Sequence, residues 1–288
     1  MKDDKAAELL HPALIEGKSL CNVIDTPGVL LMSSNPFDLT GRTALITGSS
    51  RSIGRALAEG LAQAGATVVL NGINPDRLAQ TEAELIERFG ATRIRSRAFD
   101  VTDETAAVAG VDWVEKHVAP LDVVINNAGV QHRVPMLELE VADWRRVIEA
   151  NLTSAFIVGR AAARHMVRRR SGKIINIGSV QSDLGRPTIA PYTASKGGIR
   201  NLTRSMAAEW GASGIQANSL APGYIHTEMT QKLVDDDTFN AWVLGRTPAA
   251  RWGSVEDLVG PAIWLASSAS DYVNGQTIFI DGGMTAVV

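Results

Sequence analysis

The chain of 288 residues contains a single cysteine, Cys21, and only five histidines. One cysteine cannot form an internal disulfide, and the scattered histidines lack the spacing of metal ligands. The sequence therefore predicts neither a disulfide-stabilised secreted domain nor a metal site. No apolar run reaches the roughly 18 residues of a membrane helix, and the N-terminus lacks the apolar core of a signal peptide. We therefore expect a cytoplasmic protein.

Excess charge is also absent, because the formal net charge is -3 and the pI is about 6.0. Such a balance provides no basic field for nucleic acid or an anionic membrane, and neither is predicted as a partner. A local basic cluster at 168–170 precedes Ser171 and Gly172, which indicates the C-terminus of a helix, where cations are favourable. An enzyme or a binding protein for small molecules remains.

Short apolar runs and amphipathic stretches alternate along most of the chain. The apolar runs lie at 44–46, 67–70, 121–125, 173–177 and 278–280, with weaker ones at 93–99 and 215–220. Helical periodicity is found at 53–64, 76–89, 102–117, 141–169 and 192–211. This succession predicts a single-domain α/β fold with a doubly wound parallel sheet of the Rossmann type. We place that domain at residues 37–288, and we expect residues 1–36, which lack periodicity, to be a poorly ordered extension.

A glycine-bearing turn joins the first predicted strand to the first predicted helix. Glycine is needed in a tight turn with or without a ligand, but a strand before it and a helix after it favour phosphate binding at the helix N-terminus. The candidate cofactor-binding residues of this turn are Gly48, Ser50, Arg51, Ser52, Ile53 and Gly54.

The end of the second strand, around Asn71, carries no carboxylate to receive the ribose hydroxyls of NAD. Arg51 could instead bind a 2′-phosphate, although it could also be a solvated side chain. We therefore predict that NADP(H) is favoured over NAD(H), with Asn71 and Arg51 at the cofactor.

Tyr192 and Lys196 are four residues apart, so a helix places both side chains on one face. A fixed ammonium beside a phenol favours the phenolate, and we expect Lys196 to lower the pKa of Tyr192. Such a pair is more often two surface neighbours than a catalytic acid, and the remaining motifs must decide.

Together these motifs resemble the short-chain dehydrogenase/reductase family over residues 37–288. Asp100 and Val101 resemble its adenine-binding pair, and Ser179 precedes Tyr192 by 13 residues, a spacing common in the family. Further cofactor-binding residues implied by the resemblance are Asn127, Ala128, Gly129, Tyr192, Lys196, Pro222, Gly223, Ile225 and Thr227. Ser52 departs from the pattern, since the family has glycine where the turn approaches the pyrophosphate. The Ser52 Cβ could crowd the phosphates, or its hydroxyl could contact them.

The resemblance implies a hydride transfer with four catalytic residues. Tyr192 would be the acid in reduction and the base in oxidation, and Lys196 would hold the nicotinamide ribose. Ser179 would donate a hydrogen bond to the carbonyl oxygen, and Asn151 would support a water chain that resupplies the proton. Alternatively, Ser179 only stabilises the turn that follows a strand, and Asn151 only donates a hydrogen bond to a helix carbonyl. The resemblance also implies a homotetramer.

The segments 130–133, 181–186 and 227–230 resemble members that interconvert a sugar acid and its keto form, D-gluconate and 5-keto-D-gluconate. A carboxylate requires a cation, and Arg133 is the candidate. The other candidate substrate-binding residues are Ser179, Gln181 and Tyr192. His132 could be a further polar partner or a surface or capping group, and Arg186 could bind backbone carbonyls. Trp242 is expected to pack in the segment after Pro222. Reductases for a 3-oxoacyl thioester or another sugar acid, and a non-catalytic dinucleotide sensor, remain alternatives.

Overall fold

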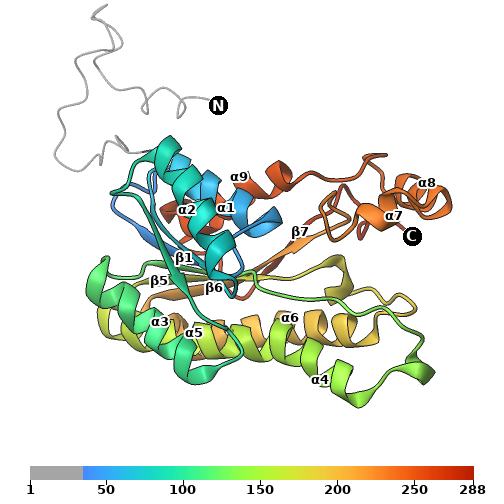
Figure 1. Cartoon of the computed structure of the whole chain (residues 1–288), viewed down its shortest axis with the longest axis horizontal. Helices are drawn as coiled ribbons and strands as arrows, with labels where there is room; N and C mark the ends of the chain where they lie inside the picture. The colour runs from blue at the N-terminus through green and yellow to red at the C-terminus, as the bar shows by residue number, and fades with distance from the viewer. Residues whose placement is uncertain (1–34) are drawn as a thin grey trace, which may run out of the picture. The chain divides into compact units, whose positions relative to one another are not determined.

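Seven strands form one parallel sheet in the order β3-β2-β1-β4-β5-β6-β7. Figure 1 shows it in a computed structural model that describes residues 35–288. The strands are β1 Thr43–Ile46, β2 Thr67–Gly72, β3 Ile94–Ala98, β4 Val123–Asn126, β5 Gly172–Ile177, β6 Ile215–Pro222 and β7 Thr277–Ile280. The strand order reverses between β1 and β4, so a crevice opens at their carboxyl ends, where such folds bind ligands. This topology confirms the predicted doubly wound fold.

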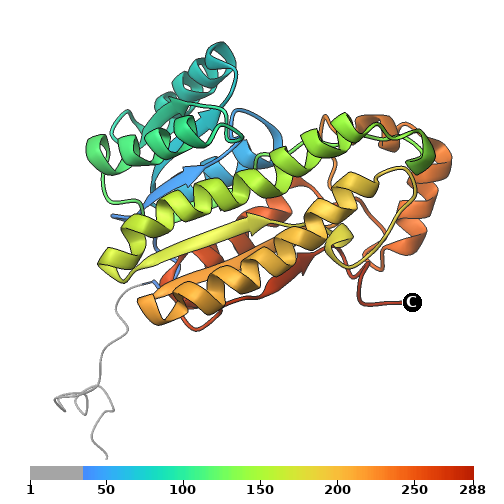
Figure 2. The same cartoon turned by 90° about the horizontal axis from the view of Figure 1, so that it is seen from below.

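Helices cover both faces of the sheet (Figures 1 and 2). One face carries α1 Ser52–Gln63, α2 Pro75–Phe89 and α9 Val259–Ala266, and the other carries α3 Glu104–His117, α4 Val141–Ile148, α5 Ser154–Arg169 and α6 Ala190–Trp210. Each layer buries its own apolar cluster, which explains why the strands are apolar on both sides. None of the helices within residues 35–288 has the length and apolar character needed to cross a membrane.

Shorter helices complete the described part of the chain. The segment after β6 contains α7 Gln231–Val234 and α8 Asp237–Arg246, and we call residues 223–246 the lid segment. The 3₁₀ turns are Met136–Glu138, Val180–Ser182, Gly211–Ser213, Val255–Leu258 and Ser268–Ser270. A π-helical turn, Glu149–Thr153, separates α4 from α5, where the sequence predicts one uninterrupted helix at 141–169.

The domain begins at Pro36, one residue before the predicted boundary. The Pro36 carbonyl accepts hydrogen bonds from the Ala269 amide at 3.3 Å and the Ser268 hydroxyl at 3.1 Å. These bonds fix the chain before β1. The prediction of a poorly ordered extension concerns mainly residues 1–34, which lie outside the described residues.

Candidate active site

The turn between β1 and α1 is shaped for close approach of an anion. Gly48 has φ of +62°, and a Cβ on Gly54 would lie 2.4 Å from the Gly48 carbonyl oxygen. Arg51, the N-cap of α1, makes no side-chain cap, whereas Asn74 caps α2 and Asp103 caps α3. The first amides of α1 therefore remain available to a phosphate. Dinucleotide binding at this turn stays a prediction with which the geometry of the turn is compatible.

Ser52 departs from the family pattern and is strained. Its φ is +51°, the left-handed region that glycine adopts freely and other residues adopt at a cost of about 1 kcal/mol. The strain shows why glycine suits this position, and it adds a backbone reason to the expected crowding of the phosphates.

We expect Ser52→Gly to tighten NADPH binding and to raise the free energy of unfolding by up to about 1 kcal/mol, because glycine adopts φ of +51° without strain. Calorimetry measures the dissociation constant, and urea denaturation measures stability. Ser171→Gly is the control, because Ser171 is exposed, is not among the residues with positive φ and is not predicted to bind the cofactor. An unchanged dissociation constant would show that the serine does not impede the phosphates.

The end of β2 is hydrogen-bonded to the turn between β1 and α1. The Asn71 side chain accepts from the Gly48 amide at 3.3 Å and donates to the carbonyls of Arg97 and Phe99 at 3.2 and 3.1 Å. The prediction placed Asn71 at the cofactor, but these bonds turn its amide inward, so its side chain positions Gly48. No carboxylate ends β2, as the sequence shows.

The other predicted adenine and nicotinamide residues also lie at strand ends. Asp100 follows β3, and its carboxylate accepts from the amide and hydroxyl of Thr102 at 2.8 and 2.7 Å. Val101, next to it, is 9% exposed. These bonds fix the loop that the family resemblance assigns to adenine.

The predicted residues after β4 are held against the phosphate turn. The Thr47 hydroxyl accepts from the amides of Asn127 and Ala128 at 2.9 and 3.0 Å. The Asn127 side chain donates to the carbonyls of Thr47 and Gly48 at 2.9 and 3.1 Å. A Cβ on Gly129 would lie 3.1 Å from Oδ1 of Asn151. These hydrogen bonds therefore hold the loops after β1 and β4 in a fixed position relative to each other.

The predicted nicotinamide loop begins where β6 ends. Pro222 is the last residue of β6, and a Cβ on Gly223 would lie 2.7 Å from the Asp281 Cα. Ile225 forms a bridge with Gly253, and the Thr227 amide donates to the Thr230 hydroxyl at 2.9 Å. These contacts anchor the start of the lid segment.

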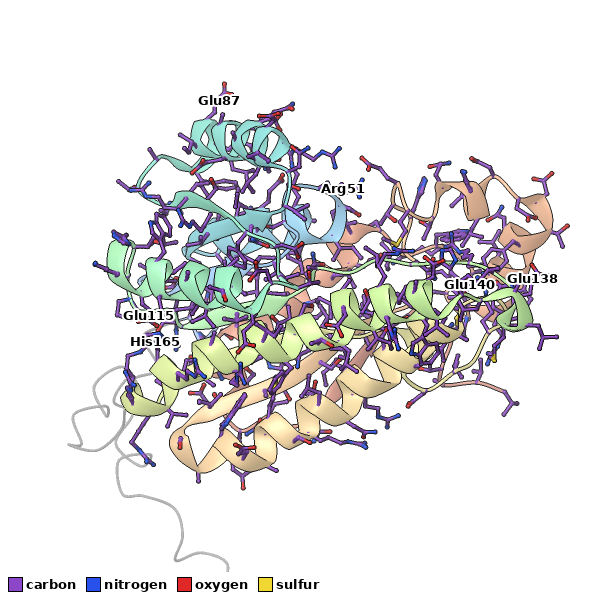
Figure 3. The ribbon with its side chains drawn as sticks, turned by 60° about the horizontal axis from the view of Figure 1, so that its bottom comes forward. Arg51, Glu87, Glu115, Glu138, Glu140 and His165 are labelled. Carbon is purple, nitrogen blue, oxygen red and sulfur yellow. The ribbon has the colours of Figure 1, made fainter. Side chains whose placement is uncertain are left out.

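Arg51 connects the phosphate turn to the lid segment. Its guanidinium lies 3.1 Å from the Glu228 carboxylate, and the two side chains are 55% and 72% exposed. Figure 3 shows Arg51 in the space between the start of α1 and the lid segment. An ion pair this exposed contributes little stability and separates easily.

Tyr192 and Ser179 meet at the carboxyl end of the sheet. Burial raises the pKa of the Tyr192 phenol, while a side-chain hydrogen bond with Ser179 and the charge of Arg133 lower it. Ser179 directly follows β5 as the N-cap of a 3₁₀ turn and accepts from the Gln181 amide at 3.2 Å. Ser179 therefore caps the turn, as the structural alternative predicted, and also contacts the Tyr192 phenol.

Lys196 lies one turn after Tyr192 and is 5% exposed. Its Nζ donates to the Ile177 carbonyl at 2.6 Å and lies 5.5 Å from the centre of the Tyr192 ring. Burial lowers the pKa of Lys196 to about 8. The prediction that Lys196 lowers the pKa of Tyr192 was wrong for this geometry, because burial dominates both groups and raises the pKa of the phenol.

Asn151 lies in the π-helical turn and joins two loops. Its Nδ2 donates to the Val130 carbonyl at 2.9 Å and the Ser195 hydroxyl at 3.2 Å, and its Oδ1 accepts from the Val130 amide at 2.7 Å. The Ser195 hydroxyl in turn donates to the Tyr192 carbonyl at 2.7 Å. Both Nδ2 protons of Asn151 are used in these bonds, and its support of a water chain stays a prediction.

The predicted substrate residues differ in their surroundings. Gln181 is 7% exposed, and its Oε1 has no hydrogen-bond partner among the described residues. Such a buried acceptor is costly unless water or a ligand hydroxyl donates to it. His132, by contrast, lies 3.5 Å from Asp143 and 3.4 Å from Arg146 on the surface.

Sequence reasoning missed Tyr224 as a neighbour of the site and weighed only backbone carbonyls as partners of Arg186. Arg186 donates to the Tyr224 hydroxyl at 3.4 Å, not to the backbone carbonyls predicted for it. Tyr224 stands two residues after Pro222, at the end of a sheet strand, which is the signal that could have identified it. Trp242 packs against Tyr224 and Phe239 with centroid distances of 5.7 and 5.4 Å, which confirms its packing role.

The sequence pattern of the family described as enoyl-(acyl carrier protein) reductase matches residues 48–285. The chain therefore belongs to the short-chain dehydrogenase/reductase family and is an oxidoreductase acting on a CH-OH group.

Three relatives are similar over nearly their whole length. A gluconate 5-dehydrogenase of Gluconobacter oxydans is 51% identical over 86% of this chain and 96% of its own. A 5-keto-D-gluconate 5-reductase of Escherichia coli is 47% identical over 88% and 98%. The crystal structure of a gluconate 5-dehydrogenase from Burkholderia cenocepacia in complex with NADP and tartrate is 51% identical over 88% and 98%, with a TM-score of 0.85.

Proposed function

We propose that this protein interconverts D-gluconate and 5-keto-D-gluconate with NADP(H). The observation that carries the proposal is the arrangement around Tyr192, where a partly buried tyrosine is hydrogen-bonded to Ser179 and lies within reach of the charge of Arg133. This arrangement combines a proton donor for a carbonyl oxygen with a cation for a carboxylate. The names of the relatives supply the sugar acid, whose chemistry the site suits.

In reduction, Tyr192 donates its phenolic proton to the carbonyl oxygen while the Ser179 hydroxyl donates a hydrogen bond to the same atom. When bound, the nicotinamide cofactor supplies the hydride. Lys196 holds the nicotinamide ribose, and Asn151 keeps the β4 loop and the start of α6 in register through Val130 and Ser195. The Gln181 Oε1 accepts from a sugar hydroxyl. In oxidation, the Tyr192 phenolate takes the proton back.

A substrate panel tests the function. The protein is incubated with NADPH or NADH and with 5-keto-D-gluconate, 2-keto-D-gluconate, a 3-oxoacyl thioester or an uncharged ketose, and nicotinamide absorbance is followed. We expect the highest kcat/KM with 5-keto-D-gluconate and NADPH. Faster reduction of the thioester would assign the protein to the alternative substrate class, and cofactor binding without turnover of any ketone would favour the sensor.

Arg51 is the residue we assign to the 2′-phosphate, and Glu228 competes with that phosphate for its guanidinium. We expect Glu228→Gln to raise the NADPH over NADH ratio of kcat/KM about threefold or more, because a carboxylate next to a phosphate is repulsive. Arg51→Ala is expected to lower the ratio about tenfold.

Glu87→Gln is the matched control for charge, since Glu87 lies on α2, away from Arg51 (Figure 3). A wild-type preference for NADH, or equal ratios for the Glu228 and Glu87 variants, would contradict this assignment.

The homotetramer and the cytoplasmic location stay predictions. Exposed apolar side chains gather on and near α4 and α5, including Trp144 and Phe156 at 38% and 41% exposure, and they support subunit contacts there.

A further inference from the structure

Two loops meet beside Tyr192, and each brings an arginine. The Val134 amide donates to the Thr188 carbonyl at 2.9 Å, which holds the loop of Arg133 against the loop of Arg186. Thr188 has φ of +70°, unfavourable for a β-branched residue, so its surroundings maintain a strained loop. Backbone strain of this kind is found where a loop must present a side chain in a fixed position.

Arg186 is oriented by the lid segment. Its guanidinium carbon lies 4.8 Å from the centre of the Phe239 ring, and it donates to the Tyr224 hydroxyl at 3.4 Å. Tyr224 is in turn packed edge-on against Phe239, Trp242 and Trp252 at 5.5 to 5.7 Å. A guanidinium stacked on a ring keeps the donors along its edge free for a planar acceptor.

Within the described part of the chain, neither arginine is neutralised by a carboxylate. Within residues 35–288, no Asp or Glu side chain lies within 4.0 Å of Arg133 or Arg186. Partial burial and the charge of Arg186 lower the pKa of Arg133, as expected for two like charges brought together. An anion would relieve this repulsion, and the charge of Arg133 also acts on the Tyr192 phenol, the proposed proton donor.

We propose that Arg186, positioned by Tyr224 and Phe239, forms with Arg133 a two-arginine clamp for the carboxylate of the substrate. The proposal rests on the proposed function and deepens it, because it states how the acid end is recognised. The keto group lies at Tyr192 and the carboxylate at the far end of the carbon chain. The clamp therefore selects keto acids over uncharged ketoses and fixes which carbon faces Tyr192.

The test compares KM values for 5-keto-D-gluconate and for an uncharged ketose. We expect Arg186→Ala to raise KM for the keto acid about 30-fold, the loss of a charge-assisted bidentate contact, and KM for the ketose less than threefold. Arg186→Lys keeps the charge but lacks the planar fork, so we expect an intermediate increase and normal folding.

Arg164→Ala is the matched control. Arg164 is an exposed arginine of α5 next to His165, which Figure 3 shows at the end of the molecule opposite the lid segment. Equal increases of KM for the keto acid and the ketose in the Arg186 variants would overturn the clamp.

A binding measurement separates failure of the clamp from failure of the proposed function. Tartrate is titrated in the presence of NADP while the fluorescence of Trp242 and Trp252, neighbours of Tyr224, is followed. If the wild-type protein reduces no sugar keto acid, the proposed function fails, yet weaker tartrate binding by the Arg186→Ala variant than by the Arg164→Ala variant still supports the clamp. Equal binding by both variants, or no binding by the wild type, overturns it.

Discussion

Replacing Tyr192 by phenylalanine is expected to reduce kcat about a thousandfold in both directions, the scale of a lost general acid. Phenylalanine keeps the ring that lies 5.5 Å from Lys196 Nζ and removes only the hydroxyl that contacts Ser179. The dissociation constant of NADPH should therefore remain within about twofold. Steady-state kinetics and fluorescence titration of NADPH measure the two quantities.

Tyr272→Phe provides the matched control, because Tyr272 is fully exposed and the chemical change is the same. Its kcat should equal that of the wild type. Retention of more than about a tenth of wild-type kcat in the Tyr192 variant would show that another group transfers the proton.

The pH dependence of the wild type follows from the pKa of Tyr192, which burial raises above its ordinary value of 10.0. The phenol is then protonated throughout the neutral range, so the reduction rate should not vary with pH there. Oxidation requires the phenolate, and its rate should rise about tenfold per pH unit. A plateau of the oxidation rate near pH 7 would show that the pKa in the ternary complex is lowered instead.

The centre of the sheet could be predicted from the sequence because β1, β4 and β5 are fully buried and contain mainly apolar residues. The run at 173–177 and the weaker one at 215–220 correspond to β5 and β6. Residues at the carboxyl ends of parallel strands share one edge, so the motif order alone brought Gly48, Ser179 and Pro222 to the same side.

Other features depend on contacts between distant segments and have weak local signals. The π-helical turn at 149–153 contains neither glycine nor proline, and Asn151 is tied there to Val130 and Ser195. Periodicity alone therefore predicts a continuous helix. Arg186 and Tyr224 are joined across the sheet edge by a hydrogen bond that no spacing rule describes. The sequence also does not reveal that the pKa of Tyr192 is raised, because the burial that raises it depends on the fold.

Lys196→Met is expected to abolish most activity and yet to stabilise the protein at neutral pH. Burial lowers the pKa of Lys196 from 10.5 to about 8, which corresponds to about 3 kcal/mol of destabilisation when the amine is charged. The variant also loses the hydrogen bond to the Ile177 carbonyl, and this loss cancels about 1 kcal/mol or more of the expected gain in stability. We therefore expect a net gain of about 1–2 kcal/mol in the free energy of unfolding at pH 7.

The gain should disappear at alkaline pH. The unfolded chain holds the Lys196 proton up to its ordinary pKa of 10.5, whereas the folded protein releases it near a pKa of about 8. The destabilisation is therefore constant below about pH 8 and decreases as the pH rises from about 8 to about 10.5. Urea denaturation of the variant and the wild type at several pH values measures the difference, in which the titration of other groups cancels.

Lys116→Met, on the exposed surface of α3, is the control and should show no such trend. A stability difference between the Lys196 variant and the wild type that stays constant from pH 7 to pH 10 would mean that the amine is solvated in the folded protein. Loss of activity combined with a pH-dependent gain in stability would instead show that the fold keeps a buried cation at a cost in stability because the site requires it.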